Sequence, residues 1–325
     1  MPLLPGEWHY LLELSNAIQW QLLWGGVIYF VISLIFLIRS LPGGPLKLIQ
    51  GLLLLPLAVI TLLLGIQTFE ELEEVWAAAE ANPPLEVKSG GDRSQPSAIR
   101  VLQHNLWHYA DNIQATMQLL YQQPADLVAL EEVSWGTYQL LNKDDTLKKL
   151  YPYRASQLDS DLMLLSQWPI DRYQFHPAYE RTHYTFHFLE AFVNSPQGPL
   201  RVMVVHPPHP TTRFRFIEHQ LLYQRMLDFY QSSQESTVLV GDFNSTHFSP
   251  QFQSFLKQSG LQNSQRAYLN TGIISGGTWP SFLPEPLRVD VDHILLSPEL
   301  KAINSRVLPA TQSDHLPVLA EFSMP

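Results

Sequence analysis

The stretch Val238-Leu239-Val240-Gly241-Asp242-Phe243-Asn244 begins with three apolar residues and ends with polar ones. A short apolar run is typical of a buried strand, and Gly241 allows the backbone to turn sharply at its end. Asp242 and Asn244 are two residues apart, so on an extended chain their side chains point the same way. A carboxylate beside an amide suits chemistry on an anion, although a plain turn is the alternative because Asp and Asn are common turn residues.

Short apolar runs alternate with helical patterns throughout the chain after residue 98. Besides the quoted stretch, we predict strands at 99–103, 126–130, 161–166, 200–205, 289–296 and 316–322, and helices at 112–122, 140–150, 213–230 and 249–258. Continuous apolar runs bounded by polar residues indicate strands that are covered on both faces. The sequence therefore predicts a layered α/β domain.

Polar side chains that can hold a metal ion or a phosphate follow these strands. They are Asn105, Glu132, His206, Asp242 with Asn244, and Asp292, and a further group, Ser313-Asp314-His315, precedes the last strand. Side chains at the ends of adjacent strands converge on one cleft, where ligands of α/β sheets usually bind. Oxygen ligands without cysteine favour magnesium, with manganese as the alternative, over zinc.

Composition excludes several classes of function. The chain has no cysteine, which rules out disulfides, zinc-thiolate sites and thiol nucleophiles. The net charge is −10, and from Arg93 onward there are 17 Lys and Arg against 21 Asp and Glu. A protein that grips a long duplex through its phosphates is expected to be basic, so this balance argues against that class.

Two long apolar runs occupy the N-terminal region, at 22–38 and 48–66. Each is close to the roughly 20 residues that cross a bilayer. A removable signal peptide would carry Lys or Arg before the first run, whereas Glu7 and Glu13 precede it. We predict a membrane anchor over 1–69 with two transmembrane helices, with a buried hairpin of core helices as the alternative.

The short connection between the two runs sets the predicted orientation. Arg39 and Lys47 are the basic residues nearest the runs, and the positive-inside rule places their loop in the cytoplasm. The rest of the chain would then be extracytoplasmic, held at the inner (cytoplasmic) membrane by a multi-pass anchor. Residues 70–97 read as an acidic helix and a flexible linker, and 98–325 as the catalytic domain. The bilayer is the expected partner of the anchor, and no protein partner is predicted.

Seven short motifs carry a resemblance to a known family. They lie at 101–105, 126–132, 164–170, 204–206, 241–244, 292–295 and 313–317. In this order they resemble the endonuclease/exonuclease/phosphatase family, metal-dependent phosphoesterases that include DNase I-like nucleases, sphingomyelinases and inositol phosphatases. The resemblance implies a four-layer sandwich of two mixed β-sheets flanked by helices. With the N-terminal hairpin, the chain resembles the bacterial membrane-anchored branch.

The resemblance also implies a set of metal-site residues. Glu132 matches the family's metal carboxylate, and Asn105 matches its partner near the metal and the phosphate. Asp314 matches a further acid of the metal site. The implied cofactor is Mg²⁺, or Mn²⁺.

A second implied set performs the chemistry. His206 matches a histidine that contacts the scissile phosphate, and Asp242 matches the residue that activates or orients water. Asn244 matches the amide that holds the phosphate. His315 matches the histidine on the phosphate, and Asp292 matches the carboxylate that orients it. A metal to offset charge, a base for water and donors for the transition state are what phosphodiester hydrolysis needs.

Some positions depart from the family pattern. Glu131 stands where Gln is usual and is expected to point to the opposite face from Glu132, and Asp161 stands where a small residue is common. His293 stands where many nucleases carry Tyr, which suggests a different substrate pocket. Asp290 is a rival to Asp292 because both would face one side of a strand.

Three functions remain open from the sequence. A nuclease that uses direct attack of water is the family's default. A phospholipid or head-group phosphodiesterase, as in the sphingomyelinases, is the alternative that the anchor and the lack of basic charge motivate. A non-catalytic binding protein on the same fold is the third.

Overall fold

The computed structural model describes most of the chain from residue 98 onward and a few N-terminal residues. The described residues are 25–29, 31, 32, 35, 98–110, 113–157, 160–177, 187–265 and 276–325. The described N-terminal positions are helical, but the rest of the predicted anchor and the whole predicted linker lie outside the described residues. Within the described residues, no helix has both the length and the apolar character needed to cross a membrane.

The first sheet contains six strands among the described residues, in the order β11-β12-β1-β2-β4-β3. Its strands are β1 (Ile99–Asn105), β2 (Leu127–Glu131), β3 (Tyr153–Ser156), β4 (Met163–Ser166), β11 (Lys301–Val307) and β12 (Val318–Ser323). β1 and β2 run parallel, and the other neighbouring pairs are antiparallel. The sheet is therefore mixed.

The second sheet repeats this arrangement. In the described part of the chain it also has six strands, in the order β5-β6-β7-β8-β10-β9. They are β5 (Ile170–Pro177), β6 (His187–Ser195), β7 (Gly198–Val205), β8 (Thr237–Asp242), β9 (Gln262–Asn263) and β10 (Asp292–Leu296). β7 and β8 run parallel at the centre, and the other neighbours are antiparallel.

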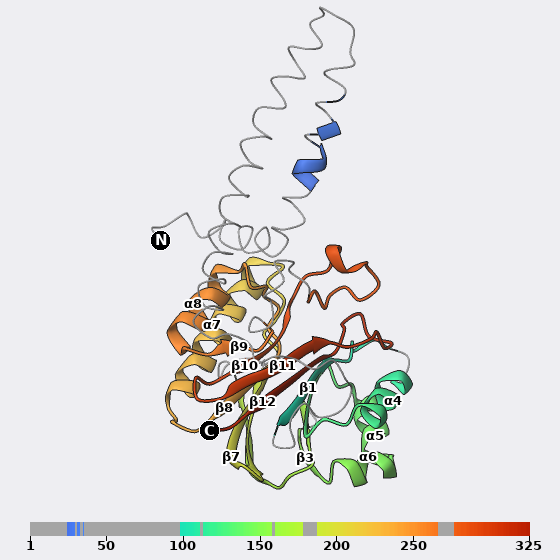
Figure 1. Cartoon of the computed structure of the whole chain (residues 1–325), viewed down its shortest axis with the longest axis vertical. Helices are drawn as coiled ribbons and strands as arrows, with labels where there is room; N and C mark the ends of the chain where they lie inside the picture. Colours follow the sequence, from blue (N-terminus) through green and yellow to red (C-terminus); the bar gives the residue numbers. More distant parts are fainter. Residues whose placement is uncertain are drawn as a thin grey trace, which may run out of the picture.

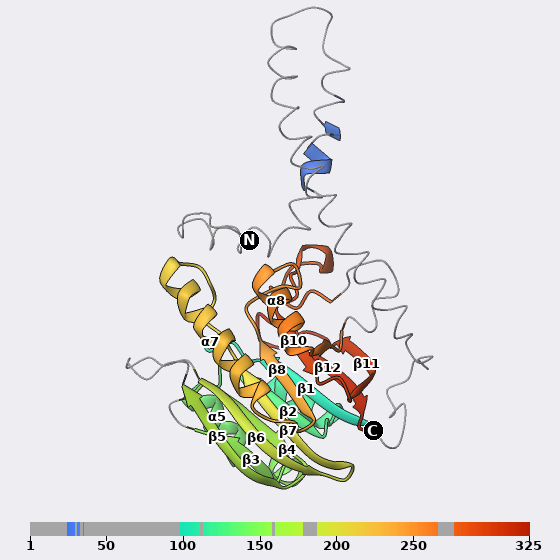
Figure 2. The same ribbon diagram turned by 90° about the vertical axis from the view of Figure 1, so that its left-hand side faces the viewer.

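Helices cover the outer faces of the two sheets (Figure 1). The α-helices are α4 (Gln114–Gln122), α5 (Trp135–Lys143), α6 (Asp145–Leu150), α7 (Arg213–Gln231) and α8 (Pro250–Ser259), and a 3₁₀ turn, η2, covers Glu285–Leu287. The first three pack on the first sheet, and α7 and α8 pack on the second (Figure 2). The predicted α/β class with two mixed sheets is confirmed.

Strand residues alternate between two apolar layers. In β1, Val101 packs between the sheets and Leu102 packs under the helices of the first sheet. In β8, Val240 faces the opposite sheet and Leu239 faces α7 and α8. Because successive strand side chains point to opposite faces, both faces are apolar. This explains why the strands read as continuous apolar runs rather than as an alternating pattern.

The predicted helix over 140–150 is wrong in detail. The chain forms α5 and α6 instead, and they meet at Asp144, which has extended backbone angles of φ −70° and ψ 117°. The Asp144 side chain accepts a hydrogen bond from the Leu147 N–H and so caps α6. A short Asp side chain favours such caps over a helix interior, and here it starts a new helix.

The two parallel strand pairs place their carboxyl ends at the same edge of the sandwich. β1 and β2 end there from the first sheet, and β7 and β8 end there from the second. Gly241 lies opposite Val205 in this register and has a φ of 152°. A Cβ at Gly241 would lie 1.9 Å from the Val205 carbonyl oxygen. Only glycine therefore lets β8 lie this close to β7 just before Asp242.

Candidate active site

A cavity of about 670 Å³ opens at this edge. It is lined by Trp107, Tyr109, Glu132, His206, Pro208, His209, Pro210, Thr211, Arg215, Asp242, Asn244, Ser245, Ser249, Trp279, Val289, Val291, Asp314 and His315. Six of the eight predicted site residues are in this lining. The other two, Asn105 and Asp292, are fully buried and contact lining residues from behind.

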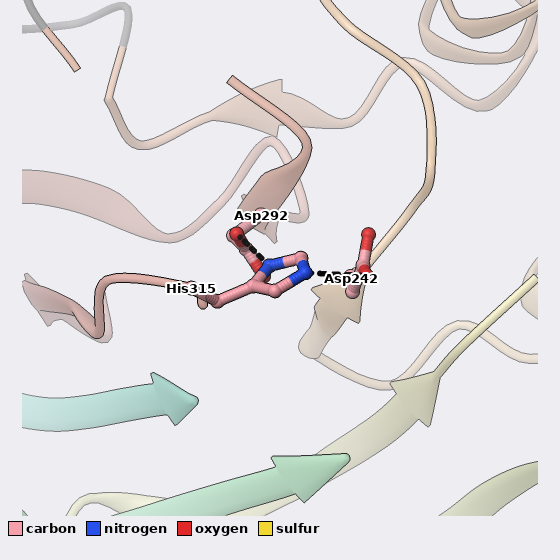
Figure 3. A group of neighbouring side chains, drawn as sticks. All are labelled: Asp242, Asp292 and His315. Carbon is pink, nitrogen blue, oxygen red and sulfur yellow. Dashed lines mark hydrogen bonds and ion pairs between the residues drawn. The ribbon is translucent and has the colours of Figure 1, made fainter. Parts of the chain in front are cut away.

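The first element of the site is a buried carboxylate–imidazole pair (Figure 3). Oδ2 of Asp292 lies 2.8 Å from Nδ1 of His315. Burial alone would lower the pKa of His315, but the charges of Asp292 and Asp242 raise it to about 10. The imidazole is thus held as an imidazolium with Nε2 turned toward Asp242, at 3.7 Å from its Oδ2 atom.

A second pair faces the first across Asp242. Nδ1 of His206 lies 2.8 Å from Oδ2 of Asp161. Burial would lower the pKa of His206, but the hydrogen bond to Asp161 and the nearby charges raise it to about 10. Its Nε2 lies 3.7 Å from Oδ2 of Asp242 and 3.8 Å from Oε1 of Glu132. Asp161 was noted in the sequence only as a departure from the family pattern, because its partner lies 45 residues away.

Asp242 lies at the centre of the two pairs. Its Oδ2 atom also accepts a hydrogen bond from Nδ2 of Asn105 over 3.1 Å, and its Oδ1 accepts from the Asn244 N–H over 2.8 Å. Burial raises the pKa of Asp242, which the His315 charge partly offsets, and the result is about 6. A carboxylate with a pKa close to neutral pH is suited to accept a proton.

Asn105 orients two carboxylates. Its Nδ2 donates to Oε1 of Glu132 over 3.0 Å as well as to Asp242, and its Oδ1 accepts from the Trp107 N–H over 2.9 Å. The amide assignment follows from these partners, since carboxylates accept and an N–H donates. Nδ2 is therefore fully used by the two carboxylates, which gives Asn105 a positioning role, while Oδ1 keeps a second lone pair.

Three residues of the lining have left-handed backbone angles. They are Trp107 (φ 57°), Glu132 (φ 55°) and Asn244 (φ 48°). No other non-glycine residue in the described part of the chain has a positive φ. Such angles cost on the order of 1–3 kcal/mol each and concentrate at functional sites. Each follows a strand end and turns a side chain into the cavity.

The arrangement matches a family of phosphoesterases. The model of the Endonuclease/Exonuclease/phosphatase family covers residues 102–315 of this sequence. The chain belongs to this family. No curated protein sequence matches the chain.

Solved structures share the fold of this family member. A humanized TDP2 from D. rerio with 14 mutations has a TM-score of 0.57 at 16% identity, covering 70% of this chain and 100% of that chain. Beta toxin 275-280 from Staphylococcus aureus has a TM-score of 0.55 at 16% identity, covering 68% of this chain and 99% of that chain. An endonuclease/exonuclease/phosphatase from Beutenbergia cavernae has a TM-score of 0.57 at 17% identity, covering 70% of this chain and 72% of that chain.

Two carboxylates on the wall of the cavity fit a divalent cation. Glu132 is 25% exposed at its side chain and faces the cavity. Oδ2 of Asp314 accepts from the Trp279 indole N–H over 3.1 Å, while its Oδ1 is buried without a hydrogen-bond partner among the described residues. A buried carboxylate oxygen without a donor is costly unless a cation satisfies it. Oxygen donors of this kind suit Mg²⁺.

A second group of acids gives a rival arrangement for a cation. One atom from each of Asp242, Asp292 and His315 lies within 4.8 Å of the others. In this group the ring nitrogen of His315 already pairs with Asp292, and its imidazole is held protonated. A metal ion at this position would have to break the pairing with Asp292 and displace a proton. Glu132 and Asp314 are therefore the better ligands.

Two expectations about departures from the family pattern are wrong. Glu131 does not point away from the site: it is fully buried, and Oε2 accepts from Nε2 of Gln103 over 2.8 Å. The same nitrogen donates to Oδ1 of Asp292. Burial, with Asp292 nearby, raises the pKa of Glu131 well above its ordinary value. Gln103 lies within the motif at 101–105 but was given no role, because its partner Asp292 lies 189 residues away.

His293 and Asp290 lie outside the cavity lining. His293 is fully buried, stacks on Phe252 and lies 2.9 Å from the carbonyl oxygen of Ser245. It therefore forms no part of a substrate pocket, contrary to the expectation from sequence. Asp290 pairs with His247 at 2.7 Å, so the structure distinguishes it from Asp292, which faces His315.

Proposed function

We propose that this family member is a divalent-metal-dependent phosphodiesterase in which water attacks the phosphorus directly. The observation that carries the proposal is the convergence on one oxygen, Oδ2 of Asp242. Nε2 of His206 and Nε2 of His315 each lie 3.7 Å from it, and both imidazoles are held by their own carboxylates. One carboxylate beside two imidazolium groups supplies a proton acceptor and two proton donors, which hydrolysis of a phosphodiester by water can use.

Each of these side chains has a definite task in the proposed reaction. Asp242 accepts a proton from the attacking water, and its pKa of about 6 leaves it ionised at neutral pH. His315 donates a hydrogen bond to a phosphoryl oxygen as negative charge develops there. His206, on the other side of Asp242, is positioned to protonate the leaving oxygen. Asn244 has two amide hydrogens, of which one goes to the Pro207 carbonyl and the other is available to the phosphate.

The metal supplies charge neutralisation. When bound, a divalent ion held by Glu132 and Asp314 would offset the negative charge on the phosphoryl oxygens. Asn105 keeps Glu132 in place through its 3.0 Å hydrogen bond. Support comes from the oxygen donor set and from a Staphylococcus aureus beta toxin of the same fold, which has bound magnesium ions.

A nuclease that acts on single strands is the first candidate for the substrate. A D. rerio TDP2 of this fold has been solved with a single strand DNA product. Trp107 and Trp279 line the cavity, and exposed aromatic rings can stack bases. Among the described residues, Arg215 is the one Lys or Arg in the lining, which argues against a duplex held by many phosphate contacts.

A phospholipid or head-group phosphodiesterase is the second candidate, and a specific observation favours it. Much of the lining is apolar or aromatic, including Tyr109, Pro208, Val289 and Val291. A phosphodiester that carries an apolar body would fill this part of the cavity while its phosphate meets Asp242.

We also propose that the domain is anchored in the cytoplasmic membrane and faces the extracytoplasmic side. The support is in the sequence: the apolar runs at 22–38 and 48–66, and the basic residues Arg39 and Lys47 between them. A reporter that is active only outside the cytoplasm, fused after Pro325, tests the orientation. Cytoplasmic location of the reporter would reverse it.

A substrate panel tests the function. Purified full-length protein is assayed on single-stranded DNA, RNA, sphingomyelin and inositol phospholipids, each with Mg²⁺ and with a chelator. Hydrolysis of nucleic acid alone supports the nuclease, and hydrolysis of lipid alone replaces that label with the second candidate. Absence of metal-dependent turnover on every substrate would favour a non-catalytic binding protein and contradict the proposed chemistry.

A further inference from the structure

Three of the most exposed large apolar side chains belong to the cavity lining or lie next to a lining residue in the sequence. Tyr109 is 77% exposed and lines the cavity itself. Phe282 is 79% exposed and lies three residues after Trp279, another lining residue. Phe214, at 64% exposed, lies one residue before Arg215 of the lining. Large apolar side chains around one opening mark an interaction surface rather than scattered surface exposure.

Helix α7 extends this surface away from the mouth. Phe214, Ile217 and Leu221 are 64%, 45% and 47% exposed. Their spacing of three and four residues places them on one face of the helix. The opposite face packs on the second sheet through residues such as Leu222 and Met226. The helix is therefore apolar on two sides, and in the described part of the chain only one of them packs against the fold.

The exposed charges beside this stripe are mostly positive. Arg213, Arg215 and Arg225 are exposed. Along the whole helix, Glu218 is 5% exposed and lies 3.5 Å from Arg215, and Asp228 is the one exposed acid. An exposed surface of Phe, Ile and Leu with three arginines and one acid has the composition of helices that lie in the interface of an anionic bilayer.

We propose that the exposed face of α7 lies against an anionic lipid surface. The arginines would meet lipid phosphates while Phe214, Ile217 and Leu221 enter the boundary with the acyl chains. Because Thr211 and Arg215 line the cavity, this contact turns the mouth toward the bilayer. The two apolar runs of the N-terminal region would keep the domain near the same surface. The inference concerns contact with lipid and does not depend on the proposed chemistry.

A fluorescent label tests the contact directly, because the chain has no cysteine. Ile217→Cys in the full-length chain is labelled with an environment-sensitive dye and placed in lipid nanodiscs that carry a quencher on the acyl chains. Leu221→Cys provides an independent second position. Lys149→Cys on α6, an exposed position in the helical layer of the other sheet, is the matched control.

We expect the dye at positions 217 and 221 to be quenched at least about threefold more than at position 149 in anionic nanodiscs, because only α7 contacts lipid. Equal quenching at all three positions would overturn the proposal. A dye at 217 that is shielded from water but not quenched by lipid would also overturn it, since another protein segment or a second copy would then cover α7. Equal quenching in anionic and zwitterionic nanodiscs would overturn the role of the arginines.

Discussion

Nε2 of Gln103 donates one hydrogen to Oδ1 of Asp292 over 2.7 Å and the other to Oε2 of Glu131 over 2.8 Å. Gln103 is fully buried between these two acids, behind the cavity. The remaining oxygen of Asp292, Oδ2, is the one that pairs with His315. A single amide on β1 therefore fixes the rotation of the carboxylate that orients the imidazole, and it links the first sheet to the second.

Replacing Gln103 by Leu should lower kcat by about 10–100-fold with little change in KM, because the imidazole loses its orientation while the cavity lining is unchanged. Steady-state kinetics on a soluble phosphodiester measures both constants. Glu131→Gln is the matched control, since its amide oxygen can still accept from Gln103, and it should stay within about fivefold of the wild type. Equal loss in both variants, or a change confined to KM, would contradict a positioning role for Gln103.

The acids Asp290 and Asp292, two residues apart, give a sharper comparison, because only one of them pairs with His315. Asp292→Asn should reduce kcat on the order of 10³-fold, because an amide cannot hold the His315 imidazolium as a carboxylate does. Asp290→Asn should stay within about threefold of the wild type, since Asp290 pairs with His247 outside the lining. If the two variants lost activity equally, the assignment of Asp292 as the orienting carboxylate would be wrong.

The stability of the metal-free protein should fall as the pH rises from about 6.5 to about 10. His206 and His315 have pKa values of about 10 in the folded chain, against about 6.5 when unfolded. Below pH 6.5 both histidines are protonated in the folded and in the unfolded chain, so their pairing with carboxylates stabilises the folded state fully. Between the unfolded and the folded pKa values, only the folded state keeps these protons. Over that range each histidine lowers the free energy of unfolding by up to about 1.4 kcal/mol per pH unit.

Urea unfolding at pH 7 and pH 9, in the presence of a chelator, measures this change. His206→Gln and His315→Gln should each reduce the difference between the two pH values. His108→Gln is the control, because the His108 side chain is exposed. A pH dependence that is the same in all three variants and in the wild type would show that these imidazoles are not held protonated.

Gly241→Ala should destabilise the domain by about 3 kcal/mol, through a combination of overpacking and an unfavourable φ. The added Cβ would lie 1.9 Å from the Val205 carbonyl oxygen, so β7 and β8 must separate just before Asp242. Gly136→Ala on α5 is the control, because its nearest neighbour would be 3.8 Å away and alanine favours a helix. Thermal or urea unfolding of the two variants distinguishes them. A Gly241→Ala variant as stable as the wild type would rule out this close approach of the strands.

The central strands were predictable from sequence because their burial is local. In β1, β2, β7 and β8 the apolar runs, with polar residues directly after them, mark the strands and the edge where they end. The outer strands were not predicted. In β5, for example, most positions between Ile170 and His176 are exposed or half-buried, so the strand has no buried run and depends on pairing with β6 for its identity.

The site could be predicted only where one residue carries its own signal. Asp242, His206 and His315 stand in short motifs, and the structure places them around one cavity. Asp161 and Gln103 could not be found in this way, because their importance lies in partners 45 and 189 residues away. The roles of the individual side chains stay predictions until variants are assayed.

The most direct test of the central claim is the initial rate of hydrolysis of bis(4-nitrophenyl) phosphate by the full-length protein with Mg²⁺. The wild type should turn this soluble phosphodiester over, lose the activity when a chelator is added, and recover it when Mg²⁺ is restored. Asp242→Asn, with its fold checked by circular dichroism, should be slower by about 10³-fold under the same conditions. Activity that survives the chelator, or an Asp242→Asn variant that retains the wild-type rate, would contradict the account.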